Sequence, residues 1–353
     1  MLDSKSVHVE ALDFDVATVA FKGARNNQED SLVSSFPLGQ RTGFAVLADG
    51  MGGHNSGSLA STLVMSETFA QLKMKEKLLE EGNVNIPATL QDAAEAANKR
   101  VTDHIESHDE TYGMGSTLLA TVIRRDKLYW VSIGDSPLLL FRHGALRQLN
   151  KDHSMAPQID MMVKTGAMSE EVGRDHPDRN TLTSAISGGK IERIDCPTRP
   201  IALLPDDIVI AASDGLQFLS NSVIARTLKR AQNDKAVDIA NALLNEVRQL
   251  EDPDQDNTAI VVIKLSAGSE QSDAIDADDL PVLATADDEE DTVEVTAIQP
   301  TKRTVKLVQS NTISFEGTSG DVEGVQPEIL SDITPISPKR ENLWYRGQTT
   351  AAD

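Results

Sequence analysis

The sequence of residues 45–54 is Ala45-Val46-Leu47-Ala48-Asp49-Gly50-Met51-Gly52-Gly53-His54. It begins with four apolar residues and continues with an acid, three glycines and a histidine. The apolar run at the start predicts a buried strand. The carboxylate of Asp49 would therefore be held in one place, at the end of a rigid element. The glycines permit a tight turn and a close approach to a ligand, so a main-chain carbonyl could join the site. An ordinary strand with a glycine-rich turn would show the same pattern, and the other motifs must decide between the two.

Acids recur at the ends of other predicted strands, each beside Gly, Ser or Asn. Singly, such acids are usually solvated. Carboxylates that converge at the edges of two sheets repel one another, and a hard divalent cation removes that repulsion. No Cys or paired-His ligand set accompanies them, so oxygen ligands predict Mg²⁺ or Mn²⁺ rather than Zn²⁺. The acids are Glu29, Asp30, Asp49, Asp135, Asp214 and Asp256.

Three residues suggest what such a site would do. Asp49 is the candidate for a carboxylate between two cations about 3.5–4 Å apart, whose shared water would lose a proton near neutral pH. Arg25 stands four residues before Glu29 and could grip two phosphate oxygens. His54 could protonate a leaving oxygen. Seen alone, an Arg at a strand end and a His in a glycine turn are more often simply solvated.

Charge and composition exclude several functions. The 353 residues carry a formal net charge of -22, which argues against non-specific binding of nucleic acid or anionic lipid. The single cysteine, Cys196, excludes an intrachain disulfide and fits a reducing compartment. There is no signal-peptide pattern at the start and no apolar run of about 20 residues. We expect a soluble, cytoplasmic protein without nucleic-acid or membrane partners.

The composition divides the chain near residue 266. Residues 1–266 alternate apolar periodic segments with turns and predict one domain, with a mobile insert at about 154–190. Hairpin-linked strands and helices in sequential pairs predict an α+β fold of antiparallel sheets covered by helices. Strands are expected at 13–21, 45–48, 117–123, 128–133, 138–142, 207–212 and 257–265, and helices at 58–79, 87–107, 222–230 and 236–250.

Residues 267–353 form an acidic, low-complexity segment that we expect to be disordered. It cannot bury enough apolar surface to offset its ordering entropy. Two short patches, Val305-Lys306-Leu307-Val308 and Leu343-Trp344-Tyr345, could dock on a partner surface. A partner kinase could phosphorylate its threonines, either to recruit a phosphothreonine reader or to give phosphates that the catalytic site removes. A solvated tail with no specific partner explains the composition at least as well. These threonines include Thr292, Thr296, Thr312 and Thr318.

In their order along the chain, the motifs resemble those of the bacterial metal-dependent protein serine/threonine phosphatases of type 2C, the PPM family. The resemblance spans residues 13–265, and it implies a four-layer α-β-β-α sandwich. Residues 154–190, with the segment 176–183, look like the flap region of the bacterial members. The matching motifs are residues 25–30 (RNNQED), 49–54 (DGMGGH), 115–117 (GST), 133–136 (IGDS), 152–154 (DHS), 213–215 (SDG) and 256–258 (DNT).

The resemblance implies two Mn²⁺ or Mg²⁺ ions per active site and a third, weaker site. It also implies hydrolysis of phosphoserine and phosphothreonine in proteins without a phosphoenzyme, by a hydroxide that bridges the two ions. Arg25 would orient the phosphate and His54 would act as general acid. The implied ligands are Asp49 between both ions, Asp214 and Asp256 at the first, the Gly50 carbonyl with Glu29 and Asp30 at the second, and Asp135 at the third.

Two other functions stay open. A catalytically silent scaffold that binds phosphoproteins would be favoured if one of the metal-binding acids were missing, and none is. A hydrolase of the same fold could act on small phosphoesters, although the insert and the long tail fit protein substrates better. Partners would be phosphorylated proteins and a cognate serine/threonine kinase.

Overall fold

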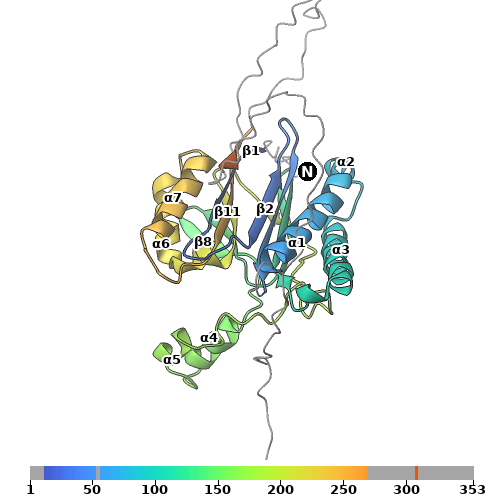
Figure 1. Ribbon diagram of the computed structural model, residues 1–353. Coiled ribbons are helices and arrows are strands. Elements are labelled where there is room, and N and C mark those ends of the chain that lie inside the picture. Colours follow the sequence, from blue (N-terminus) through green and yellow to red (C-terminus); the bar gives the residue numbers. More distant parts are fainter. Residues whose placement is uncertain (1–11, 53–55, 269–306, 309–353) are drawn as a thin grey trace, which may run out of the picture. The chain divides into compact units, whose positions relative to one another are not determined.

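The computed structural model describes residues 12–52, 56–268 and 307–308, and two six-stranded sheets form its centre (Figure 1). Every strand pair is antiparallel except β12 with β1. The first sheet has the order β12 (Leu307–Val308), β1 (Leu12–Phe21), β11 (Thr258–Ala267), β10 (Ile208–Ala212), β7 (Leu138–Arg142), β8 (Ala145–Gln148). The second has the order β2 (Asp30–Ser35), β3 (Thr42–Met51), β5 (Leu118–Arg124), β6 (Lys127–Ile133), β9 (Ile201–Ala202), and β4 (Gly115–Ser116) pairs with β3.

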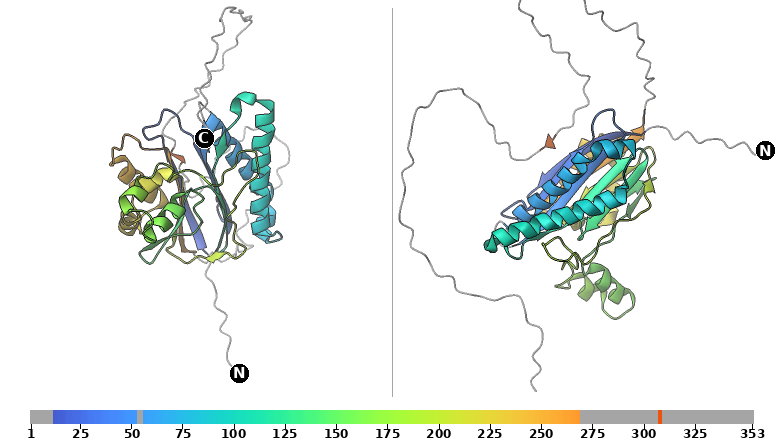
Figure 2. Two further views of the ribbon diagram at one scale, coloured as in Figure 1. Left: turned by 90° about the horizontal axis from the view of Figure 1, so that it is seen from below. Right: turned by 90° about the vertical axis from the view of Figure 1, so that its right-hand side faces the viewer.

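Helices cover the outer face of each sheet, which confirms the predicted four layers. Helices α1 (Ser56–Met74) and α3 (Ile86–Ser107) lie on the second sheet, with α2 (Glu76–Glu81) between them in sequence. Helices α6 (Asn221–Ala231) and α7 (Ala236–Arg248) lie on the first sheet. A third apolar cluster, with Leu140 and Val261 from one sheet and Leu119 and Trp130 from the other, fills the space between the sheets. The views in Figure 2 show the two sheets between the helix pairs.

The helices form because their apolar residues fall on one side. In α6 the buried residues Ile224, Thr227, Leu228 and Ala231 repeat at three- and four-residue steps, the spacing of one helix face. Ser220 begins this helix, and its hydroxyl accepts from the Val223 amide. Strand β3 is buried on both faces between α1 and the other sheet, which is why it reads as a continuous apolar run.

Both predicted hairpin turns are confirmed. Arg124 pairs with Lys127 across a two-residue turn in which Arg125 has φ 57°. Arg142 pairs with Ala145 across a second one, in which His143 has φ 50° and Gly144 φ 80°. In the second turn, positive φ at both central positions matches the right-handed twist of the flanking strands, and Gly144 adopts it without steric cost.

The structure differs from the predicted elements in several places, and the short strands β4, β8 and β9 were also not predicted. The helix expected over 58–79 stops at Met74 and resumes as α2, because Lys75 has a non-helical ψ of 4°. Strand β2 was not predicted, since its sequence Asp-Ser-Leu-Val-Ser-Ser has only two apolar residues. The insert at 154–190, expected to lack periodicity, contains α4 (Ala156–Lys164) and α5 (Glu170–Arg174). Each of these short helices buries a single residue, which explains the weak signal.

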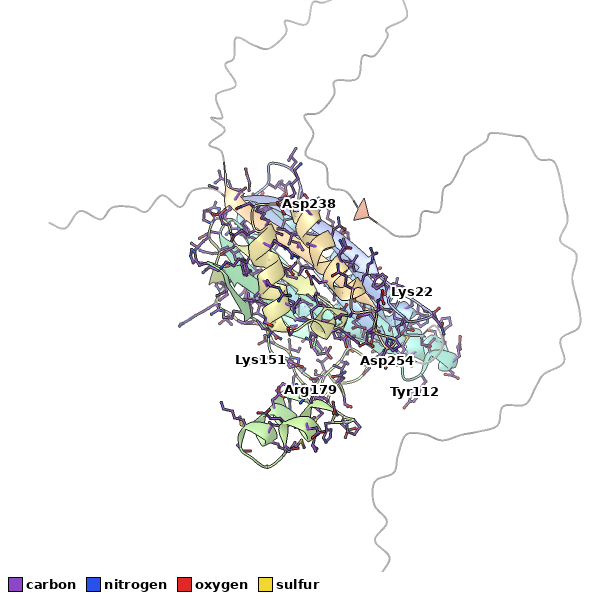
Figure 3. All side chains as sticks on the ribbon, turned by 90° about the vertical axis from the view of Figure 1, so that its left-hand side faces the viewer. Lys22, Tyr112, Lys151, Arg179, Asp238 and Asp254 are labelled. Atoms are coloured by element: carbon purple, nitrogen blue, oxygen red, sulfur yellow. The ribbon has the colours of Figure 1, made fainter. Side chains whose placement is uncertain are left out.

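The insert projects from the sandwich, and the two chain segments that connect it to the rest of the domain lie side by side (Figures 1 and 3). A backbone bond of 3.0 Å from Met155 N to Thr181 O and the bridge between Ser154 and Leu182 close its base. Arg179, labelled in Figure 3, binds Asp160 of α4 at 2.7 Å. The Nη1 of Arg179 also donates to the Gly173 carbonyl oxygen of α5 at 3.4 Å, so this side chain links the two helices of the insert.

The chain divides into two compact units, Met1–Asn311 and Thr312–Asp353, and the second unit lies wholly outside the described residues. Of the segment predicted as a tail, the structure describes Ala267, Gly268 and the strand β12. The domain boundary at residue 266, the disorder of 267–353 and the second docking patch remain predictions. Within the described ranges, no helix has the length and apolarity needed to cross a bilayer.

Candidate active site

Carboxylates from both sheets meet at one edge of the sandwich. Asp30 opens β2 and lies directly opposite Asp49, near the end of β3. Asp214 follows β10 as the first residue of a 3-10 helix, Asp214–Phe218. Asp256 precedes β11 by two residues. The pKa of Asp49 responds to the charges of Asp30, Asp214, Asp135 and Asp256, so the structure brings these predicted site residues together.

Burial, together with this crowding, disfavours the charged forms of Asp30, Asp49, Asp135 and Asp214. Burial raises the pKa of Asp30 to about 8, and the charges of Asp214 and Asp256 add to the effect. Burial likewise raises the pKa of Asp135 to about 8, with Asp214 contributing. The pKa of Asp214 rises to about 6, through burial and then Asp256. Burial, followed by the charge of Asp30, holds the pKa of Asp49 well above its ordinary value.

Two buried carboxylate oxygens in this group, Asp30 Oδ1 and Asp214 Oδ1, have no hydrogen-bond partner. A buried charged oxygen without a partner is costly, and a cation would supply one. Hard oxygen donors of this kind suit Mg²⁺ or Mn²⁺. The residues therefore fit a divalent metal site. As the described side chains stand, however, no three His, Cys, Asp or Glu form a ready-made ligand group, so the ligand set belongs to the proposal below.

Hydroxyl groups form hydrogen bonds with the Asp30 carboxylate and with the backbone of Asp49. Ser213 Oγ donates to Asp30 Oδ2 at 2.7 Å and is itself held by the Ala259 amide at 2.9 Å. Thr117 Oγ1 accepts from the Asp49 amide at 3.0 Å. Ser116 Oγ donates to the Asp49 carbonyl oxygen at 2.9 Å. The sequence contained these residues within its motifs, but no pattern in it indicated which acid each hydroxyl would hold.

Two glycines allow backbone segments of the site to pack closely against each other. A side chain on Gly50 would clash with the Gly57 carbonyl at the start of α1, and one on Gly57 would meet the Glu29 carboxylate. The Gly50 amide also donates to the Glu29 carbonyl oxygen at 3.1 Å. Gly50 and Glu29, predicted to serve one ion, are therefore neighbours. Burial raises the pKa of Glu29, while Arg25 lowers it.

Arg25 lies in the loop between β1 and β2, where its Nη2 contacts Asp256 Oδ2 at 2.6 Å. The guanidinium therefore reaches the carboxylate group. The side chain remains 57% exposed, so a further hydrogen-bond acceptor can approach its N–H groups. Lys22 and Asp254, close to Arg25 and Asp256 in sequence, lie at the same end of the sandwich (Figure 3). His54 lies outside the described residues.

Asn257 binds the Arg25 loop at three points, and sequence reasoning gave it no role. Its Oδ1 accepts from the Glu29 amide at 2.7 Å. Its Nδ2 donates to the carbonyl oxygens of Lys22 at 2.7 Å and Asn27 at 3.0 Å. The side chain is buried and belongs to the residue next to Asp256. One amide therefore ties the loop of Arg25 and Glu29 to the start of β11.

The two antiparallel sheets between helix pairs match the fold of solved PPM-type serine/threonine phosphatases. The chain belongs to the Protein phosphatase 2C family, whose model matches residues 24–251. Both the fold class and the family predicted from the sequence are thereby confirmed.

Individual relatives agree with this assignment. The chain is 31% identical over 178 residues to the serine/threonine phosphatase stp of Listeria monocytogenes, covering 48% of this chain and 65% of the relative. The match therefore spans less than two thirds of that relative's length. The crystal structure of the Mycobacterium tuberculosis serine/threonine phosphatase PstP/Ppp superposes with TM-score 0.58 at 30% identity, over 72% of this chain and 99% of the other. The PstP catalytic domain in complex with two manganese ions gives TM-score 0.57 at 28% identity, over 72% and 99%.

Proposed function

We propose that this protein is a metal-dependent phosphatase that hydrolyses phosphoserine and phosphothreonine in proteins. The observation that carries the proposal is the convergence of Asp30, Asp49, Asp135, Asp214 and Asp256, with Arg25 in contact with the group. Its listerial and mycobacterial relatives are named serine/threonine phosphatases. The substrates would be proteins that a partner serine/threonine kinase has phosphorylated.

The acids and the Gly50 carbonyl would hold two Mn²⁺ or Mg²⁺ ions, in the arrangement that the resemblance implies. Asp49 would lie between them, Asp214 and Asp256 at the first, and Glu29, Asp30 and Gly50 at the second, with Asp135 at a third, weaker site. The manganese complex of the PstP catalytic domain supports this choice of metal. When bound, the ions supply positive charge beside the phosphate and lower the pKa of the attacking water.

Side chains of the protein would bind the phosphate and protonate the leaving group. Arg25 would bind two equatorial oxygens of the phosphate and hold phosphorus in line for attack by water. As the new P–O bond forms, the bond to the serine or threonine oxygen breaks, and His54 would give that oxygen its proton. No phosphoenzyme forms, so Ser213 is not a nucleophile. Its hydroxyl is instead committed to Asp30.

The test is hydrolysis of a phosphothreonine peptide by the full chain, with Mn²⁺, with Mg²⁺ and with EDTA. A panel of small phosphoesters is measured alongside. Metal-dependent release of phosphate from the peptide, lost in Asp214→Asn, is the expected result. Turnover of small phosphoesters alone would support a metabolite phosphatase. Binding of the phosphopeptide without turnover under any metal would support the silent scaffold.

A further inference from the structure

Two aromatic rings stay in solvent although the described domain buries its other Phe, Tyr and Trp side chains wholly or in part. They are Tyr112, which is 87% exposed, and Phe218, which is 38% exposed. A single exposed apolar side chain needs no explanation. These two share a location, however. Phe218 comes four residues after Asp214, and Tyr112 comes four residues before Ser116, whose hydroxyl binds the Asp49 carbonyl oxygen.

Phe218 is the last residue of the 3-10 helix that Asp214 begins. Such a helix rises about 2 Å per residue, so Phe218 lies about 8 Å along it from Asp214. The side chain of the preceding residue, Gln217, donates from Nε2 to the Asp135 carbonyl oxygen at 3.3 Å. The other apolar side chains of this segment are buried, those of Leu216 and Leu219. The exposed ring therefore lies close to two of the site's acids.

Tyr112 lies in the loop between α3 and β4, and hydrogen bonds fix the backbone of this loop. The Tyr112 amide donates to the Asp109 carbonyl oxygen at 3.2 Å, and the Met114 amide donates to that of Thr111 at 3.1 Å. The side chains of Thr111 and Met114 are buried. The ring of Tyr112 is thus exposed on a backbone that is already ordered, which lowers the entropy cost of any contact it makes.

The Tyr112 loop leads directly to the carboxylates. β4 pairs with the end of β3, Ser116 with Gly50 and Gly115 with Met51. Four residues span at most about 14 Å, which limits the distance between the Cα atoms of Tyr112 and Ser116. Figure 3 shows Tyr112 at the same end of the sandwich as Lys22 and Asp254.

The two rings belong to different halves of the sandwich. Phe218 follows β10 of the first sheet, whereas Tyr112 precedes β4, which pairs with β3 of the second sheet. The carboxylates also come from both sheets. An extended peptide advances about 3.3 Å per residue, so about four residues on either side of a phosphorylated residue would reach these distances.

We propose that Tyr112 and Phe218 bind the substrate peptide on opposite sides of its phosphorylated residue. Aromatic rings give a large contact area at a low cost in side-chain entropy, and they dominate many peptide and protein interfaces. The occupant is thus an extended phosphopeptide, and a small phosphoester leaves both rings unused. The inference rests on the proposed phosphatase function and adds to it the residues that select a protein substrate.

The kinetic test compares two substrates of the full chain at saturating Mn²⁺. One is a phosphothreonine peptide with about four residues on each side, and the other is p-nitrophenyl phosphate. We expect the ratio of their kcat/KM values to fall about tenfold, in favour of the small ester, in Tyr112→Ala and in Phe218→Ala, mainly through KM for the peptide. A ratio that stays at the wild-type value in either variant overturns the proposal.

Leu38→Ala is the matched control for these variants. Leu38 is 74% exposed and lies in the turn between β2 and β3, at the end of this hairpin opposite to Asp30 and Asp49. Its replacement removes exposed apolar surface without touching the site, so the ratio should remain that of the wild type. A ratio that falls equally in Leu38→Ala contradicts a specific role for the two rings.

Shortened peptides test whether the rings lie on opposite sides. Removing the residues before the phosphothreonine should abolish the effect of one of the two alanine variants, and removing those after it should abolish the effect of the other. If the same truncation abolishes both effects, the rings do not flank the phosphorylated residue.

Binding without turnover separates this inference from the phosphatase function. The longer peptide is dye-labelled and carries a non-hydrolysable phosphonate in place of the phosphate, and its Kd is measured by fluorescence anisotropy. We expect Kd to rise about tenfold in both alanine variants and not in Leu38→Ala. Equal Kd values in all proteins would overturn the role of the rings. Ring-dependent binding, without turnover of either substrate, would support the rings and refute the phosphatase function.

Discussion

Arg25 and Asp256 form an ion pair, with 2.6 Å between Nη2 and Oδ2, although they come from the loop after β1 and the loop before β11. The pair joins a residue proposed to bind phosphate to one proposed to bind metal. Asp256 also accepts, through Oδ1, from the Asn257 amide at 2.7 Å. The guanidinium is therefore placed beside the carboxylates before any substrate arrives.

Replacing Arg25 by alanine should reduce kcat/KM for a phosphothreonine peptide by roughly 10²–10³, the cost of one lost charge-stabilising donor. Arg25→Lys should recover only part of this, because an ammonium group cannot bind two phosphate oxygens in a planar fork. Steady-state kinetics with saturating Mn²⁺ would measure both variants. Wild-type kcat/KM in Arg25→Ala would remove Arg25 from the mechanism.

Asp214→Asn should lower turnover at least about 10³-fold, because it removes a carboxylate charge from the proposed metal site. The buried Asp214 Oδ1 has no hydrogen-bond partner, so its replacement breaks no described contact of that atom. The matched control is Asp234→Asn, an exposed aspartate remote from the cluster in sequence. Manganese binding by calorimetry should weaken in the first variant and not in the second. Full activity of Asp214→Asn would refute the assignment.

Asn257→Ala should destabilise the fold by about 2 kcal/mol, since it leaves the Glu29 amide and two carbonyl oxygens without partners. It should also raise KM for the phosphopeptide, because the Arg25 loop loses its tie to β11. Asn98→Ala is the control. Asn98 makes a similar pair of bonds, to Gly189 O at 2.7 Å and from Gly188 N at 3.0 Å, on helix α3.

Thermal unfolding and peptide kinetics would separate the two asparagines. Both variants should unfold at lower temperature, but only Asn257→Ala should show a raised KM. Equal kinetic effects would mean that Asn257 acts through stability alone.

The metal-free protein should lose stability as the pH rises from about 4 to about 8. Asp30 and Asp135 have folded pKa values of about 8 and Asp214 of about 6, all above the ordinary value of 3.8. For an acid with a raised folded pKa, the folded state binds the proton more tightly than the unfolded state. Its contribution is therefore complete below the unfolded pKa and is lost as the pH passes through the folded pKa.

Melting temperatures in EDTA at pH 5 and pH 8 would check this, beside the same measurements with Mn²⁺. We expect a lower melting temperature at pH 8 in EDTA and its recovery with the metal, since a cation compensates the carboxylate charges. A melting temperature in EDTA that does not fall between the two pH values would contradict the crowding of these acids.

The sequence by itself determined the strands, hairpins and helix pairs wherever apolar residues repeat with a clear period, as in α6 and β3. It also singled out Asp49 and Asp214 as candidate site residues, because each comes directly after an apolar run. It failed at β2 and in the insert, because two apolar residues in six, or one buried residue per helix, give almost no periodic signal.

Only the tertiary structure decided which residues meet. Asp30 faces Asp49 because β2 and β3 pair in one register, and Asp256 joins Arg25 because β11 returns beside β1. Local periodicity carries no information about such pairings between distant segments. For the same reason, the sequence did not predict the three hydrogen bonds of the Asn257 side chain or the pairing of β12 with β1. Residue types alone predicted the kind of site, a carboxylate-rich metal site. Which side chains meet in it depends on strand register and on the order in which the strands lie in each sheet.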